Sequence, residues 1–339
     1  MQLDERFDDL IDSLGGFHRA WLIYLGLDLG LFAALRAAGP PGMTPDALAD
    51  ATATTRDAMG VWSWAADAHD LVELTEEGRL VSNESIATIL LDTDRLEYLG
   101  GQFTHAVVAS MDWDRMAEFF RTGVALEARP DRYLASIERL TEQDIAVFFQ
   151  EVLSALPQLV DDLSGGGRLL DVHCGGALWL VGMARRFPAV TGVGVEGEPD
   201  SVARARAHVA AAGLDERLEI HIGDVTAATE RGPFDLVYYQ YALHSLADPA
   251  ASLRAAWSAV RPGGRVIVLD WPLPSTPDEF RTRHGELIAG VQLDAMLGGR
   301  HLAPREHFVG WFERAGIGLP TVIDLPSGAS VVLAERPTS

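Results

Sequence analysis

The stretch Arg168-Leu169-Leu170-Asp171-Val172-His173-Cys174-Gly175-Gly176-Ala177-Leu178 decides the fold of this 339-residue chain. Its first residues have the apolar character of a buried strand, and a glycine-containing turn leads into a helical pattern that begins at Leu178. A strand, a tight glycine turn and a helix make up the start of a nucleotide-binding βαβ unit. The stretch therefore predicts an α/β fold with an open parallel sheet.

Each of three further strand-like runs ends in a polar residue: 190–196, 218–224 and 234–244. In an open parallel sheet, ligands bind in a crevice at the carboxyl ends of the strands. An acid at the end of the second strand can accept hydrogen bonds from both hydroxyls of a ribose. We therefore expect one crevice to be lined by Asp171, Glu196, Asp224 and His244.

The glycine turn separates two kinds of nucleotide site. Dinucleotide dehydrogenases need G-x-G-x-x-G at this turn, whereas only Gly175 and Gly176 are present here. The acid at the strand end, Asp171, suits a cationic ligand better than a phosphate. The pattern resembles the first motif of the class I S-adenosylmethionine methyltransferases, D-x-G-x-G-x-G, with His173 and Ala177 at its first and third glycine positions.

Later segments extend this resemblance to the small-molecule O-methyltransferases. Gly223-Asp224 is similar to the family's adenine-contacting G-D, segment 240–248 to its K-x-x-L-H-D-W-x-D, and segment 261–270 to its R-P-G-G strand. The resemblance implies a Rossmann-like catalytic domain and S-adenosylmethionine as cofactor. It places the cofactor-binding residues at Asp171, Gly175, Glu196, Asp224 and Gln240.

Composition excludes several classes of function. The formal net charge of −22 argues against nucleic-acid binding, which needs clustered cations. All 27 basic residues are Arg, so Schiff-base chemistry and a phosphate-loop Lys are absent. No apolar run reaches the roughly 18 to 20 residues that span a bilayer, and the amino terminus does not have the pattern of a signal peptide. The single cysteine, Cys174, excludes an internal disulfide, and we expect a cytoplasmic protein without a membrane partner.

The chain divides by pattern into three parts. Residues 1–95 predict a mainly α, winged-helix-like domain, which in the resembled family is a dimerisation module; we therefore expect a homodimer. Residues 96–163 predict a helical linker, and residues 164–339 the cofactor-binding catalytic domain. The linker carries residues that either form a wall for a small substrate or are helix core and solvated surface: Trp113, Phe119, Phe120, Arg121, Arg129, Arg132 and Tyr133.

The catalytic candidate is His244, at the position where the resembled O-methyltransferases place a general base. In that family a G-K-E-R-T segment supplies a Glu that braces the base, but here His301 stands at the Glu position and Ser245 replaces the Asp that follows the base. Two carboxylates are lost and one imidazole is gained. An imidazole cannot stabilise the imidazolium that the base becomes, so the ordinary general-base interpretation is weakened.

Two convergent imidazoles favour a metal site instead. A first-row transition metal such as iron, held by His244 and His301, would chelate an α-keto acid and acidify its β-carbon for methylation. This resembles the phenylpyruvate-type C-methyltransferases of natural-product pathways. O-methylation of a phenol or hydroxyl by His244 is the alternative. A third interpretation, from the altered first motif, is a cofactor-binding relative that does not methylate.

Overall fold

The computed structural model describes residues 3–338 and divides the chain into two compact units. The helical unit comprises the chain up to Asp114 together with Pro130–Gln143, and the sheet unit comprises Arg115–Arg129 and the chain from Asp144 onward. The division of the chain into three parts at residues 95 and 163 stays a prediction from the sequence.

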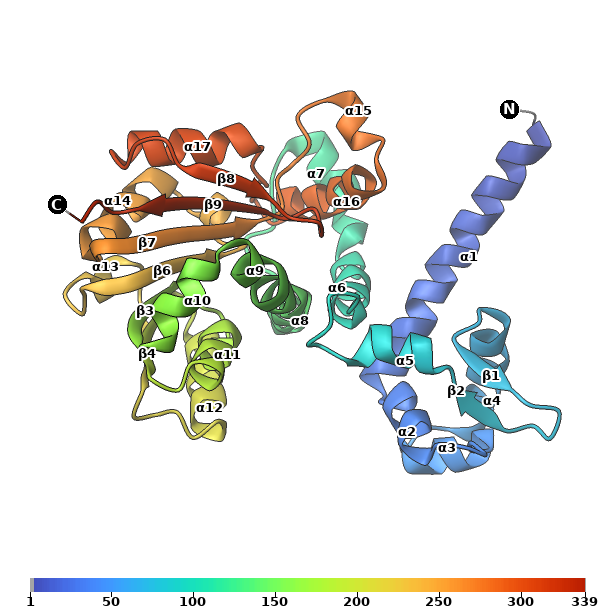
Figure 1. The fold of residues 1–339 in the computed structure, drawn as a ribbon. Helices are drawn as coiled ribbons and strands as arrows, with labels where there is room; N and C mark the ends of the chain where they lie inside the picture. The colour runs from blue at the N-terminus through green and yellow to red at the C-terminus, as the bar shows by residue number, and fades with distance from the viewer. Residues whose placement is uncertain (1–2, 339) are drawn as a thin grey trace. The chain divides into compact units, whose positions relative to one another are not determined.

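The helical unit consists of helices and one small hairpin at its edge (Figure 1). Thr44 caps α3 by accepting a hydrogen bond from Ala47 N, and Pro45 occupies the first helical position, as the sequence predicts. The hairpin turns at Gly78, whose φ of +71° suits glycine. The elements are α1 (Leu3–Asp28), α2 (Leu31–Ala38), α3 (Pro45–Ala51), α4 (Arg56–Ala68), β1 (Val72–Leu74), β2 (Leu80–Ser82), α5 (Glu84–Leu91), α6 (Gly100–Ser110) and most of α8 (Asp131–Val147).

The long helix α1 has two different halves. Its second half contributes Ile23 to the hydrophobic core of the helical unit, where it joins Leu31 and Leu35 of α2. The second half of α1 and the helix α2 are therefore covered in part by the core of their own unit. The first half carries the uncovered apolar side chains, among them Leu3 and Leu10, which are 83% and 66% exposed.

The sheet unit contains seven strands in the order β5-β4-β3-β6-β7-β9-β8. The pairs among β5, β4, β3, β6 and β7 are all parallel, whereas β9 pairs antiparallel with β7 on one side and with β8 on the other. This confirms the predicted α/β class. The strands are β3 (Gly167–Val172), β4 (Val190–Glu196), β5 (Leu218–Ile222), β6 (Phe234–Gln240), β7 (Val260–Asp270), β8 (Thr321–Asp324) and β9 (Ser330–Glu335).

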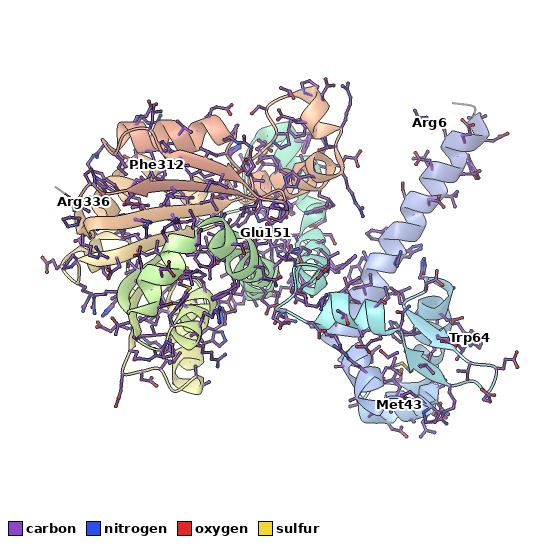
Figure 2. The ribbon with its side chains drawn as sticks, viewed as in Figure 1. Arg6, Met43, Trp64, Glu151, Phe312 and Arg336 are labelled. Carbon is purple, nitrogen blue, oxygen red and sulfur yellow. The ribbon has the colours of Figure 1, made fainter. Side chains whose placement is uncertain are left out.

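Helices cover both faces of this sheet (Figure 1). One face buries Val172, Val237 and Val268 against Phe308 and Phe312 of α17, the second of which is labelled in Figure 2. The remaining elements are α7 (Met116–Thr122), a π-helical turn (Phe148–Val152), α9 (Leu153–Ala155), α10 (Pro157–Ser164), α11 (Leu178–Arg186), α12 (Pro199–Ala211), α13 (Thr226–Thr229), α14 (Pro249–Ala259), α15 (Pro277–Phe280), α16 (Arg283–Leu297) and α17 (Arg305–Arg314).

The order of the sheet positions its ligand crevice. β3 lies between β4 and β6, so the connections leave it in opposite directions and the strand order reverses there. Asp171 and Glu196 lie at the carboxyl ends of their strands as predicted. His244 does not end a strand: β6 stops at Gln240, and His244 sits in a 3-10 turn, Leu243–Ser245, beyond it.

Within the described residues, no single helix is both long and apolar enough to cross a membrane. Only α1 and α2 taken together reach that length and composition, and the two are bent by 67° at the break between them. The cytoplasmic location remains a prediction.

Candidate active site

The loop that follows β3 is held from several sides. Gly175 N donates a hydrogen bond of 3.1 Å to Glu196 Oε2, which joins the loop to the end of β4. Cys174 N donates to the Val195 carbonyl at 3.1 Å, and the ring Nδ1 of His208 on α12 lies 2.8 Å from the Gly176 carbonyl. The Asp171 strand end and Glu196 therefore belong to one locally fixed site.

The backbone of this loop keeps the form that three glycines would allow. His173, Gly175 and Ala177 have φ values of +58°, +51° and +56°, all in the left-handed region. A side chain in that region costs about 1 to 2 kcal/mol relative to glycine. The departures from the glycine motif therefore leave the shape of the loop unchanged, and the protein tolerates local strain at two of its positions.

The acids of the crevice have different electrostatic environments. Asp171 is buried, and burial together with the nearby charge of Glu196 raises the pKa of its carboxyl to about 8. Asp224 accepts hydrogen bonds from Thr226 N at 2.8 Å and from the Thr226 hydroxyl, and these bonds lower its pKa. The charge of His173 acts in the same direction, which shows that the loop after β3 lies near Asp224.

The loop leaves open space for a ligand. No atom lies within 4 Å of the position that a Cβ would take at Gly175 or at Gly197, which follows Glu196. Among the described residues, the buried indole N–H of Trp179, on the helix that the loop begins, has no hydrogen-bond partner. Open backbone and carboxylates at adjacent strand ends fit a ligand that carries hydroxyls and positive charge.

Gln240 is the last residue of β6. Its side-chain carbonyl oxygen accepts a long hydrogen bond, 3.4 Å, from the Tyr238 hydroxyl. Since β6 is the direct neighbour of β3, Gln240 belongs to the same strand edge as Asp171. The structure therefore brings the five predicted cofactor residues to adjacent strand ends.

His244 has a carboxylate partner that the sequence did not reveal. Its Nδ1 lies 2.8 Å from Asp270 Oδ2, and only 5% of the His244 side chain and 3% of the Asp270 side chain are exposed. The expectation that the base lacks a carboxylate brace is wrong. Asp270 ends β7, which pairs with β6 through Gln240 and Leu269, so the sheet brings it beside the turn that carries His244. The only feature of the sequence that could have indicated this partner is the position of Asp270 at the end of the R-P-G-G segment.

Tyr241 is a second feature that sequence reasoning missed. Its φ is +49°, which is unusual for a bulky residue, and its ring lies edge-on to the His244 ring with centroids 4.8 Å apart. Tyr241 N donates to the Leu269 carbonyl at 2.9 Å. A strained backbone held in place by the neighbouring strand thus presents an aromatic wall to the base.

Among the described residues, the predicted metal pair of His244 and His301 is not completed by a third protein ligand. Nδ1 of His244 is engaged by Asp270, and Nδ1 of the exposed His301 lies 3.2 Å from the Gln292 side-chain amide. Gln292 also accepts a hydrogen bond from Leu302 N, so it fixes the loop that carries His301. Across residues 3–338, no group of three or more His, Cys, Asp or Glu side chains is arranged to hold a metal.

Several residues of the proposed substrate wall have structural partners. Arg129 and Asp294 form an ion pair of 3.2 Å with side chains 4% and 5% exposed, and Arg132 pairs with Asp112. Tyr133 is buried beside His105 in the helical unit. For these three residues the interpretation as core and ion pairs is the better one, whereas Phe120 is 67% exposed.

Comparison with known proteins identifies the family. The methyltransferase domain family matches residues 131–319, more than half of the chain, and the chain belongs to this family. The ubiquinone biosynthesis O-methyltransferase of Aeromonas salmonicida is 37% identical over 116 residues, 32% of this chain and 46% of that protein. Its counterpart in Xanthomonas axonopodis pv. citri is 32% identical over 164 residues, which are 46% of this chain and 65% of that protein. The match thus covers less than two thirds of these relatives.

Solved structures with the same fold extend over the whole chain. PigF with SAH superposes with a TM-score of 0.74 at 18% identity, over 97% of this chain and 99% of the other. Human N-acetylserotonin methyltransferase in complex with SAM superposes with a TM-score of 0.70 at 17% sequence identity, over 100% of this chain and 99% of the other. The mitomycin 7-O-methyltransferase MmcR superposes with a TM-score of 0.70 at 21% sequence identity, over 98% of each chain. These structures confirm the predicted methyltransferase fold with an amino-terminal helical domain, whereas the winged-helix-like form of that domain stays a prediction.

The first prediction concerns the buried Asp171. Its pKa of about 8 exceeds the ordinary value near 3.8, so the folded protein loses stability as pH rises between these values. Asp171→Asn removes this loss and should raise the melting temperature at pH 8 but not at pH 4. A thermal-shift series from pH 4 to pH 9 measures the difference in melting temperature between the variant and the native protein. The exposed Asp215→Asn is the control and should show no such pH-dependent difference. A lower melting temperature for Asp171→Asn at pH 8 would contradict the assignment.

The second prediction concerns the strained loop. His173→Gly removes the cost of a side chain at φ +58°, so the free energy of unfolding should rise by roughly 0.5 to 1 kcal/mol. Ala207→Gly, in the regular helix α12, should lower it by about 1 kcal/mol. Denaturant unfolding compares the two variants. Destabilisation by His173→Gly would mean that contacts of the imidazole outweigh the strain.

Proposed function

We propose that this protein is an S-adenosylmethionine-dependent methyltransferase that methylates an oxygen atom of a small molecule, with His244 as general base. The buried contact of 2.8 Å between His244 Nδ1 and Asp270 Oδ2 carries this proposal. It supplies the carboxylate whose apparent loss favoured a metal-assisted reaction.

The pair sets the roles of the two ring nitrogens. A carboxylate accepts, so Nδ1 of the neutral imidazole carries the hydrogen that is donated to Asp270. Nε2 then keeps a lone pair that can take the proton of a phenol or hydroxyl. As His244 becomes positive, the charge of Asp270 stabilises it. S-adenosylmethionine, when bound, supplies an already activated methyl group, so the protein's main task is to align and deprotonate the acceptor oxygen.

The strand-end acids support this cofactor. Glu196, at the end of β4, is placed to accept from the ribose hydroxyls, and Asp224, after β5, to accept from the adenine amino group. Gly175 gives the cofactor close access to the backbone because its Cβ position is open. We assign Asp171 and Gln240 to the methionine part and the adjoining ribose. Positive charge in the ligand would favour the ionised form of Asp171.

Metal-assisted methylation of an α-keto acid has less support. Among the described residues, no third protein ligand joins His244 and His301, and Asp294 neutralises the buried charge of Arg129, which a substrate carboxylate would otherwise need. The names of the curated relatives also refer to O-methylation. The carboxylate substrate and the place in natural-product metabolism stay predictions from the sequence alone.

A second copy of this chain is the proposed partner for α1. The exposed residues Leu3, Phe7, Leu10, Leu14 and Phe17 follow one another at alternating steps of four and three, the spacing of a coiled-coil seam. The first half of α1 extends beyond the other elements of its own unit (Figures 1 and 2, where Arg6 marks it). An apolar stripe of this length is costly to leave in water, and pairing of two α1 helices would cover it.

The third prediction tests the base. A mass-spectrometric screen of phenols, alcohols and keto acids with S-adenosylmethionine should yield an O-methylated product. His244→Ala should lower kcat by about 10²- to 10⁴-fold, because proton removal is lost. Asp270→Asn should lower it by about tenfold or more, because the imidazolium loses its counter-charge.

His301→Ala and treatment with a chelator serve as matched controls, and both should leave the activity nearly unchanged. Loss of activity in both, with a methylated keto acid as product, would restore the metal-assisted reaction. Cofactor binding without any methylated product would favour the non-methylating interpretation.

The fourth prediction tests whether two copies of this chain pair through α1. Light scattering should give about twice the chain mass of 36.7 kDa for the native protein. The double variant Leu10→Glu with Leu14→Glu should give a monomer, because two charges enter the apolar stripe of each helix. The double variant Glu5→Gln with Asp12→Asn, on the opposite side of α1, is the control and should remain dimeric. A native protein that runs as a monomer rules out the pairing.

A further inference from the structure

A chain of hydrogen bonds connects His244 to a second buried carboxyl group. One oxygen of Asp270 lies 2.8 Å from His244 Nδ1, and the other accepts the backbone N–H of Trp271 at 2.9 Å. The indole N–H of Trp271 donates to Asp144 Oδ1 at 2.7 Å. Asp144 is 5% exposed and lies near the end of α8, just before the π-helical turn. The mechanism proposed above makes no use of it.

Packing fixes the indole that makes this connection. The Trp271 ring stacks on His284 of α16 with centroids 5.6 Å apart and an angle of 28° between the planes. Behind His284, a Cβ at Gly328 would lie 3.1 Å from the ring Nδ1, so the turn between β8 and β9 closes on it. That turn is tied down by Ser327, whose N and Oγ both donate to Glu151, labelled in Figure 2.

The charge of Asp144 changes near neutral pH. Burial raises the pKa of its carboxyl to about 7, the charge of Asp270 adds to this, and the hydrogen bond from Trp271 acts in the opposite direction. Nearby titratable groups include Tyr238 on β6, on which the charges of Asp144, Asp171 and Asp270 all act, and His284 on α16, behind the indole. Burial raises the pKa of Tyr238 and lowers that of His284, so both are neutral where Asp144 titrates.

We propose that Asp144 is a positioning residue that acts through Trp271: it holds the Asp270 carboxylate against His244 and sets how readily the imidazole takes up a proton. The inference rests on the proposed function in that His244 is the base. A charged Asp144 stabilises the imidazolium and makes His244 a stronger base, and a neutral Asp144 makes it a weaker one. A carboxyl group that only accepts the indole hydrogen bond would have no such effect.

The test is the protonation of His244 in the full-length protein, followed by NMR of the imidazole Cε1–H across pH 5 to 9. The His244 signal is assigned by its loss in His244→Gln. Asp144→Asn keeps an oxygen for the indole but cannot ionise. We expect it to lower the His244 titration midpoint by on the order of half a pH unit, since a removed charge acts over one bridging residue.

A second variant keeps the test decisive if Asp144→Asn does not fold. Trp271→Phe keeps a ring on His284 but removes the indole donor, so Asp144 holds its proton more tightly and the midpoint should again fall. The combined variant should lower it no further than Asp144→Asn alone, because both act on one connection. Glu142→Gln, two residues earlier on α8, is the control, because its carboxylate accepts the Tyr98 hydroxyl instead.

An unchanged His244 midpoint in Asp144→Asn, or in Trp271→Phe where only that variant folds, overturns the proposal. Additive shifts in the combined variant overturn the route through Trp271. The titration needs no substrate, so it separates this inference from the proposed function. A protein that methylates no acceptor would remove the function while the shifts of the midpoint still decide the role of Asp144.

Discussion

Parallel pairing of β4, β3, β6 and β7 is the constraint on which the rest of the site depends. Because neighbouring parallel strands end at the same edge, residues far apart in sequence meet there without any further device. Glu196, Asp171 and Gln240 come together in this way, and Asp270 comes beside the turn that holds His244. The chemistry of the crevice follows from the order of the strands, while the helices on the two faces keep that order fixed.

Three carboxyl groups are buried at or near this edge of the sheet: those of Asp171, Asp270 and Asp144. Burying an ionised carboxylate costs desolvation free energy and so lowers the stability of a fold. Burial raises the pKa values of Asp171 and Asp144, so each is neutral or ionised according to what lies near it. Both oxygens of Asp270 accept hydrogen bonds, one from His244 and the other from Trp271 N. A protein that needed only stability would fill these positions with apolar side chains. For Asp144, which Trp271 connects to Asp270 and His244, the role proposed above is control of the proton affinity of His244.

The first cofactor motif shows how a sequence can depart from a pattern while the structure keeps its shape. Motif comparison treats His173 and Ala177 as losses, since both stand where glycine is usual. The backbone nevertheless keeps positive φ at both positions, supported by hydrogen bonds from Gly175 to Glu196 and between His208 and Gly176. Hydrogen bonding to neighbouring elements can therefore maintain a loop that the local residue preference disfavours.

The sequence by itself determined the α/β class, the strands that form the crevice and the helix starts at Pro45 and Leu178, because these depend on local periodicity, capping and turn residues. It also placed the cofactor acids at strand ends. It did not determine the partner of His244, because Asp270 is 26 residues away and meets it only through the pairing of β6 with β7.

The tertiary structure also gives His244 and His301 different hydrogen-bond partners, Asp270 and Gln292, which the sequence alone did not indicate. It also showed that the exposed apolar side chains lie on the first half of α1, whereas Ile23 in the second half is buried. In each case the outcome depended on which side chains from distant segments come within contact distance. Residue patterns describe one segment at a time, so they cannot supply that information.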